Sequence, residues 1–413
     1  MDWQTPEDTV PSFFITEANA RSIAGGPPAT GAWREGDHPG DRRFVNLGAL
    51  RLESGDQLPQ VKIAYETWGT LDADAGNAIL VLHALTGDSH VIGRPGAGHR
   101  TAGWWGDLVG PGKPVDTDRY FVVAPNMLGG CQGSTGPASL ASDGREWGAR
   151  FPYITIRDQV AAQAAFADRI GVARWAAVIG GSMGGMQAIE WAVMYPRRVG
   201  SLVAVATCMQ ATAQQIAWGA IGRRAIRLDP KWRGGDYYDA EPGDGPAEGL
   251  EIARMVAQVT FRSDNVFTDR FGRELADKAA TGDTLGMWQR FEVERYLEHH
   301  GAKLARRFDT NSYLAIGKAM DLHDVVRGRG SLERAMLRVT APTMTVGIWS
   351  DMLYPAYQQR QIHDAIAANG VSSEYVEIDS PHGHDSFLIN SDQLAEPLER
   401  FLETAATTFS STA

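Results

Sequence analysis

The chain has 413 residues, of which 43% are hydrophobic and 22% are charged. This composition is typical of a folded globular protein and excludes a disordered, collagenous or coiled-coil chain. The 39 Lys and Arg against 50 Asp and Glu give a formal net charge of -11, which disfavours binding to nucleic acid or to an anionic membrane surface.

From the amino terminus, residues 1–43 show no sustained periodicity, and we expect a loosely ordered arm there. The sequence has no signal-peptide pattern and no run of 18 apolar residues, so it predicts neither secretion nor membrane insertion. Its two cysteines, Cys131 and Cys208, are too few for a disulfide framework, and we expect a cytoplasmic protein.

Residues 44–207 and 339–403 are expected to form one α/β core domain. Apolar runs of strand length recur in both parts, at 78–83, 120–124, 175–180, 202–206, 343–348 and 374–378. Helical patterns lie between some of them, at 158–170, 186–195 and 357–369. Several runs are continuous, as expected for strands buried on both faces of a parallel sheet. The alternation therefore predicts a mostly parallel central sheet flanked by helices.

Residues 208–338 interrupt this alternation with a stretch rich in Trp and Arg, a Gly/Pro/Asp loop and helix-like segments. We interpret them as a helical lid inserted above the sheet, where a lid can exclude water and shape substrate entry. The small, polar residues 404–413 predict a flexible tail.

The sharpest chemical signal is a GxSxG motif formed by Gly180, Ser182 and Gly184, directly after a predicted strand and before a predicted helix. In this context the glycines allow neighbouring backbone to approach closely, and the serine is held on a strained turn with its hydroxyl exposed. The motif predicts Ser182 as a nucleophile.

A serine hydroxyl needs a histidine base that is itself oriented by a carboxylate, and in this architecture the chain order is Ser, Asp or Glu, then His. Asp351 follows the predicted strand 343–348, and His382 and His384 follow the strand 374–378. All three groups would meet at the carboxyl ends of the strands. Spacing alone leaves open which of the two histidines is the base.

Acyl transfer also needs an oxyanion hole, for which the backbone N–H groups of Met183 and Leu85 are the candidates. The histidines lack the HExxH spacing, and neither GxxxxGK[ST] nor a strand-following GxGxxG occurs. The sequence therefore predicts no metal site and no nucleotide-phosphate loop.

Four separate runs of the sequence, in order, resemble the homoserine O-acetyltransferase family of α/β-hydrolase-fold acyltransferases. They are HALTGDSHV (83–91), NMLGGCQGSTGP (126–137), GGSMGGMQAIEW (180–191) and GHDSFL (383–388). The similarity covers about residues 47–402 and implies the α/β-hydrolase fold with a helical lid.

The resemblance also implies residue roles. Ser182 would be the nucleophile, Asp351 the orienting acid and His384 the general base, with Leu85 and Met183 in the oxyanion hole. Arg254 and Asp385 would hold the carboxylate and the amino group of homoserine, with Thr86 nearby, as the chemistry of a guanidinium and a carboxylate allows. One departure is visible at Phe261, where this family is expected to have a tyrosine, so a hydroxyl contact would be missing.

The activity implied is transfer of an acetyl group from acetyl-CoA, through acyl-Ser182, to L-homoserine in methionine biosynthesis. The resemblance implies no permanently bound cofactor and suggests a homodimer. Alternatives are succinyl transfer, serine as acceptor, or an esterase with the same triad, because fold and triad do not choose the acceptor. Because coenzyme A is polyanionic, we expect a cationic entrance, with Arg223, Arg224, Arg227, Lys231 and Arg233 as candidates.

Overall fold

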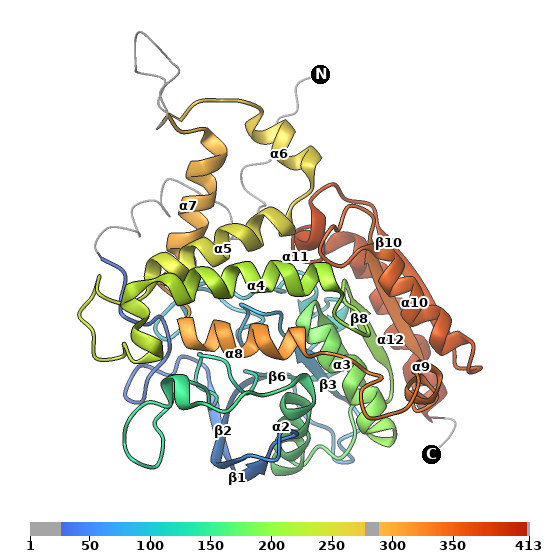
Figure 1. Cartoon of the computed structure of the whole chain (residues 1–413). Helices are drawn as coiled ribbons and strands as arrows, with labels where there is room; N and C mark the ends of the chain where they lie inside the picture. Colours follow the sequence, from blue (N-terminus) through green and yellow to red (C-terminus); the bar gives the residue numbers. More distant parts are fainter. Residues whose placement is uncertain (1–25, 277–288, 411–413) are drawn as a thin grey trace.

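The computed structural model describes residues 26–276 and 289–410 and is built on an eight-stranded sheet (Figure 1). The strands lie in the order β1-β2-β6-β3-β7-β8-β9-β10. Their bounds are β1 Arg43–Arg51, β2 Gln57–Trp68, β3 Ala78–Leu82, β6 Phe121–Pro125, β7 Ala177–Gly181, β8 Leu202–Val205, β9 Thr343–Ile348 and β10 Ser373–Ile378. From β6 to β10 neighbours are parallel, and β2 runs antiparallel to both β1 and β6. The prediction of a mostly parallel central sheet is confirmed.

The inner strands are buried on both faces because successive side chains point to opposite sides. In β3, Ala78, Leu80 and Leu82 join one hydrophobic cluster, whereas Ile79 and Val81 join the other. The first cluster holds the sheet against helices α2 (Ile156–Arg169), α3 (Met183–Met194) and α10 (Ala356–Ala367). The second contains residues of α12 (Asp392–Ser410) and of the segment 91–120. That segment includes the two short strands β4 (Val109–Gly110) and β5 (Val115–Asp116).

The inserted region between β8 and β9 is helical and lies over one end of the sheet (Figure 1). Its helices are α4 Ala213–Leu228, α5 Ala247–Phe261, α6 Asp264–Phe271, α7 Glu292–Ala305, α8 Thr310–Asp321 and α9 Leu332–Met336. Helix α4 packs against α5 and α8, and α5 also packs against α7. Within the described residues, no helix combines the length and the apolar character needed to span a membrane.

The return from this region to the core is fixed by a buried carboxylate. Glu190 on α3 is fully buried and pairs with Arg157 of α2 at 3.2 Å and with Arg329 at 2.6 Å. Arg157 also donates to the carbonyl of Asp324 at 2.8 Å. A buried charge with two guanidinium partners strongly favours one arrangement, since loss of either partner would leave it uncompensated.

The two chain ends differ from the sequence-based expectation where they are described. Residues 26–43 of the expected arm lie against the core, with Ala32 and Arg42 buried and the N–H of Trp33 donating to the carbonyl of Cys131 at 2.9 Å. Helix α12 continues to Ser410, through most of the expected tail. Residues 1–25 and 411–413 lie outside the described residues.

Candidate active site

Ser182 occupies a strained turn between β7 and α3. Its φ of 57° and ψ of -121° are unusual for a residue with a side chain, and they mark a nucleophile elbow. Glycines make room for the turn: a Cβ on Gly184 would lie 2.1 Å from the carbonyl oxygen of Leu82. The Ser182 N–H donates to the carbonyl of Val205 at 2.9 Å, which ties the turn to β8.

A continuous hydrogen-bond chain links Ser182, His384 and Asp351. Ser182 Oγ lies 2.9 Å from His384 Nε2, and His384 Nδ1 lies 2.7 Å from Asp351 Oδ2. All three side chains are buried, and they follow β7, β10 and β9 respectively. The second oxygen of Asp351 accepts the N–H groups of Leu353 and Tyr354 at 2.8 Å each, which fixes its orientation. Of the two histidines left open by the sequence, the geometry places His384 beside the serine.

The electrostatic environment of His384 suits a base. Burial lowers the pKa of the imidazole, but the adjacent Asp351 carboxylate outweighs burial and raises this pKa above its ordinary 6.5. The rings of Tyr354, Phe387 and Phe261 surround the imidazole at centroid distances of 5.2, 5.5 and 5.8 Å. His384 can therefore take the proton of Ser182 in a site shielded from water.

The backbone N–H groups of Leu85 and Met183 are the two expected oxyanion donors. Across residues 26–276 and 289–410, neither the Leu85 N–H nor the Met183 N–H has a hydrogen-bond acceptor. Met183 is the first residue of α3, so the positive end of the helix dipole adds to its N–H. Leu85 and Thr86 line the same cavity as Ser182, and the Thr86 carbonyl accepts a hydrogen bond from Arg307 at 2.8 Å.

One cavity connects the triad with the inserted helices. Ser182, His384, Arg254 and Asp385 all line it, together with residues of α4, α5 and α8. Of the five cations expected at an entrance, Arg223 lines this cavity, where it pairs with Asp321 at 2.5 Å. The buried thiols of Cys131 and Cys208 are outside it, and burial raises the pKa of each to about 12, which makes them poor nucleophiles.

Arg254 and Asp385, the two residues expected to bind the substrate, both line the cavity but differ in their ion pairing. Arg254 on α5 is 9% exposed, and among the described residues its guanidinium has no hydrogen-bond or ion-pair partner. It lies 5.1 Å from the ring of Phe261, which also lines the cavity. Asp385, in contrast, is paired with Arg262 at 2.8 Å. Arg262 could not be predicted from the sequence, because nothing in the local pattern distinguishes it from a surface arginine at a helix end.

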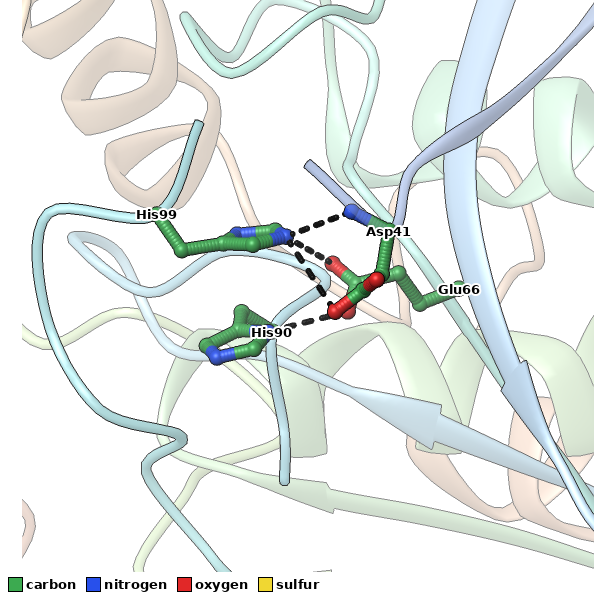
Figure 2. Close-up of side chains that lie close together, drawn as sticks. All are labelled: Asp41, Glu66, His90 and His99. Atoms are coloured by element: carbon green, nitrogen blue, oxygen red, sulfur yellow. Dashed lines mark hydrogen bonds and ion pairs between the residues drawn. The ribbon is translucent and has the colours of Figure 1, made fainter. Parts of the chain in front are cut away.

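Side chains that commonly ligate metals also gather away from the triad, and Figure 2 shows them: Asp41, Glu66, His90 and His99. Part of their hydrogen-bonding capacity is used within the cluster, whereas His90 Nε2 and His99 Nδ1 are buried with no hydrogen-bond partner among the described residues. Glu66 accepts hydrogen bonds from Ser89 Oγ at 2.7 Å and from His90 Nδ1 at 2.9 Å, and His99 Nε2 accepts the Asp41 N–H at 2.9 Å.

The two imidazole rings of this cluster stack at 3.8 Å with 13° between their planes. Parallel stacked rings cannot both direct an in-plane nitrogen lone pair at one ion, so the arrangement fits a hydrogen-bonded anchor better than a metal centre. The anchor joins β2 to the segment that follows Leu85 and Thr86.

A nucleophilic elbow, a Ser-His-Asp chain and a mostly parallel sheet define the class of α/β-hydrolase-fold proteins, and the family model "alpha/beta hydrolase fold" matches residues 77–391. The chain is 54% identical over 401 residues to a homoserine O-acetyltransferase from Leifsonia xyli subsp. xyli, covering 97% of this chain and 99% of that relative. The chain therefore belongs to the homoserine O-acetyltransferase family, and the resemblance seen in the sequence is confirmed.

Solved structures of two kinds share the fold. The homoserine O-acetyltransferase from Bacillus anthracis superposes with a TM-score of 0.80 at 29% identity, over 87% of this chain and 97% of that one. Esterase E22 superposes with a TM-score of 0.79 at 28% identity, over 87% of this chain and 99% of that one. The overall fold therefore does not distinguish an acyltransferase from an esterase. The residues that line the cavity must distinguish them.

Proposed function

We propose that this chain transfers an acetyl group from acetyl-CoA to the hydroxyl of L-homoserine through an acetyl-Ser182 intermediate, in methionine biosynthesis. The observation that carries the proposal is a serine with a complete His384–Asp351 relay opening into a cavity that also holds Arg254, a cation with no ion pair among the described residues. An ester hydrolase has no need of an unpaired buried cation beside its nucleophile. An amino-acid acceptor does need one, for its carboxylate.

In the first half-reaction, His384 takes the Ser182 proton as the hydroxyl oxygen attacks the thioester carbonyl of acetyl-CoA. The negative charge that develops on the carbonyl oxygen is stabilised by the free N–H groups of Leu85 and Met183. The C–S bond then breaks, and the thiolate of coenzyme A leaves with the proton held by His384. The enzyme retains an acetyl ester on Ser182.

In the second half-reaction, homoserine binds with its carboxylate on Arg254 and its amino group towards Asp385, near Thr86. His384 accepts the proton of the homoserine hydroxyl, whose oxygen attacks the acetyl ester. The bond to Ser182 Oγ breaks, and His384 returns the proton to that oxygen. A bound and oriented alcohol outcompetes water because its effective concentration at the ester carbon is far higher.

The test is a thiol-release assay with purified protein and acetyl-CoA. We expect a burst of about one free thiol per active site without homoserine, and continuous release once homoserine is added, the kinetic mark of an acyl-enzyme. Ser182→Ala should remove both phases, and intact-mass measurement should find no acetylated protein.

Parallel arms with succinyl-CoA and with serine decide between the family alternatives. Thiol release at the same rate with and without homoserine would instead identify an esterase-type hydrolase.

We also propose that the protein works in the cytoplasm as a homodimer. Both cysteines are free thiols, as expected in a reducing compartment. Helices α4 and α5 carry exposed large apolar side chains on their outer surface, at Ile216, Ile221, Leu228, Ile252 and Val259. Such a patch on paired helices is typical of a surface that a second subunit covers.

A further inference from the structure

The carboxylate expected to bind the substrate amino group is already neutralised by the protein. Asp385 Oδ2 lies 2.8 Å from Arg262 Nη1, and the Arg262 side chain is only 3% exposed. Arg262 follows directly after α5, and its Nε also lies 3.3 Å from the hydroxyl of Tyr296. Asp385 Oδ2 is therefore held in an ion pair with the buried Arg262 guanidinium.

Arg254, the cation expected to bind the substrate carboxylate, differs from Asp385 in its ion pairing. Within the described part of the chain, Arg254 has neither an ion pair nor a hydrogen bond, although it is buried. Its guanidinium packs on the Phe261 ring and faces the cavity. Asp385 acts on this desolvated guanidinium through space but forms no ion pair with it, so a bound substrate carboxylate would stabilise the charge of Arg254.

The charges of the cavity wall favour an anion at this end. Besides His384, the charged lining residues among those described are Arg223, Asp321, Arg254 and Asp385. Arg223 and Asp321 neutralise each other. Arg254, together with the Arg262–Asp385 pair, leaves one net positive charge beside the triad. A substrate ammonium would meet a carboxylate that already has a partner, with two guanidinium groups nearby.

We propose that the acceptor is held mainly by its carboxylate and that Arg262, as a positioning residue, sets this preference by neutralising Asp385. The enzyme then also acetylates hydroxy acids without an amino group, of the class of 4-hydroxybutanoate. This inference rests on the proposed function and uses the same second half-reaction. The hydroxyl oxygen of the hydroxy acid bonds to the acetyl carbon, the bond to Ser182 Oγ breaks, and His384 carries the proton between the two oxygens.

Two acceptors that each lack one charged group of homoserine test the proposal on the unaltered enzyme. 4-Hydroxybutanoate lacks the amino group, and 3-aminopropan-1-ol lacks the carboxylate, while both keep the hydroxyl and the carbon chain. We expect kcat/KM to fall about tenfold for 4-hydroxybutanoate and at least about a thousandfold for 3-aminopropan-1-ol, relative to homoserine. Product O-acetyl esters are measured by mass spectrometry beside thiol release. Equal losses, or the reverse order, would overturn the inference.

Variants test whether Arg262 sets the preference for an acceptor carboxylate over an acceptor amino group. In Arg262→Met, Asp385 is freed and the local charge falls, so the ratio of kcat/KM for 4-hydroxybutanoate over 3-aminopropan-1-ol should fall at least about tenfold. Arg262→Lys should restore most of the ratio. Arg295→Met, which removes an exposed arginine paired with Glu292 on α7, is the matched control and should leave the ratio unchanged. An unaltered ratio in Arg262→Met would remove Arg262 from this role.

The burst with acetyl-CoA alone gives the fraction of each variant that is folded with a working triad, and rates are normalised to it. If Arg262→Met shows no burst, the acceptor ranking on the unaltered enzyme decides. The two failures are distinguishable. An enzyme that does not acetylate homoserine refutes the proposed function, whereas one that acetylates homoserine but prefers the amino alcohol refutes this inference alone.

Discussion

The backbone strain at Ser182 is offset by contacts from a neighbouring strand and loop. A non-glycine residue at φ 57° costs on the order of 1–3 kcal/mol. The Ser182 N–H donates to Val205, and the Ser182 carbonyl accepts from Thr207 Oγ1 at 2.8 Å. These bonds hold the residue in a conformation that presents Oγ to His384, so the strain serves positioning of the hydroxyl.

The pH dependence of activity follows from the pKa of His384. If His384 is the base, as proposed, it must be neutral to accept a proton. Asp351 raises the pKa of His384 above 6.5 despite burial, so kcat/KM should rise with pH through an inflection above 6.5. Asp351→Asn removes the raising charge, which should move the inflection to lower pH and reduce kcat by about four orders of magnitude. The check is a pH profile of homoserine-dependent thiol release for both proteins.

The raised pKa of His384 also makes the stability of the fold depend on pH. Because the folded-state pKa of His384 lies above its ordinary value, the pairing with Asp351 stabilises the fold fully below about pH 6.5 and progressively less as pH rises through the folded-state pKa. If the pH profile of thiol release had its inflection at the same pH in Asp351→Asn as in the unaltered protein, the ion pair with Asp351 would not be the source of the raised pKa of His384.

Among single residues, those with a local motif could be predicted and those defined by burial could not. Ser182 and His384 lie in strand-following loops whose sequence pattern indicates their chemistry, and the structure brings them within 2.9 Å. The role proposed for Arg262 depends on Asp385, distant in sequence, being folded against it. The lack of an ion pair at Arg254 within the described residues is likewise a property of the packed cavity, which no spacing rule encodes.

At the scale of elements, the buried strands were predictable because their apolar runs are continuous. The run 343–348 coincides with β9, and the runs for β3, β6, β7, β8 and β10 agree within two residues at each end. The antiparallel pair β1 and β2 was missed. Many of its side chains are exposed or half-buried, so its sequence mixes polar and apolar residues and resembles a loop.

The contact between α3 and β3 depends on the absence of a side chain at Gly184. A Cβ there would meet the backbone oxygen of Leu82 at 2.1 Å, so Gly184→Ala must push the helix away from the strand. We expect a loss of about 1–3 kcal/mol in the free energy of unfolding and a smaller acetyl-CoA burst. Urea denaturation measures the first effect, and thiol release measures the second.

Gly96→Ala is the matched control, because a Cβ at Gly96 would meet nothing within 4 Å. Its free energy of unfolding should change by no more than about 0.5 kcal/mol. Equal stability of the Gly184 and Gly96 variants would show that the elbow tolerates a wider separation of helix and strand than the structure implies.

At the scale of the whole molecule, the inserted helices have two distinct faces. The inner faces of α4 and α5 line the cavity through residues such as Trp218 and Arg254. Their outer surfaces expose apolar side chains seven residues apart, Ile221 and Leu228 on α4 and Ile252 and Val259 on α5. Because a spacing of seven returns to the same side of a helix, each pair forms a stripe, and the two helices pack against each other. A partner covering these stripes would hold both helices over the triad.

The proposed homodimer should therefore separate when these stripes become charged. Ile221 is 50% exposed and Ile252 is 48% exposed, so Ile221→Glu with Ile252→Glu changes little inside one subunit but places like charges across a dimer contact. We expect the unaltered protein to have twice the mass of one chain by light scattering, and the double variant to have the mass of one chain. Leu337→Glu, at a side chain 60% exposed beyond α9, should remain dimeric. An unaltered protein that is monomeric at micromolar concentration, or a double variant that stays dimeric, would exclude this surface as the subunit interface.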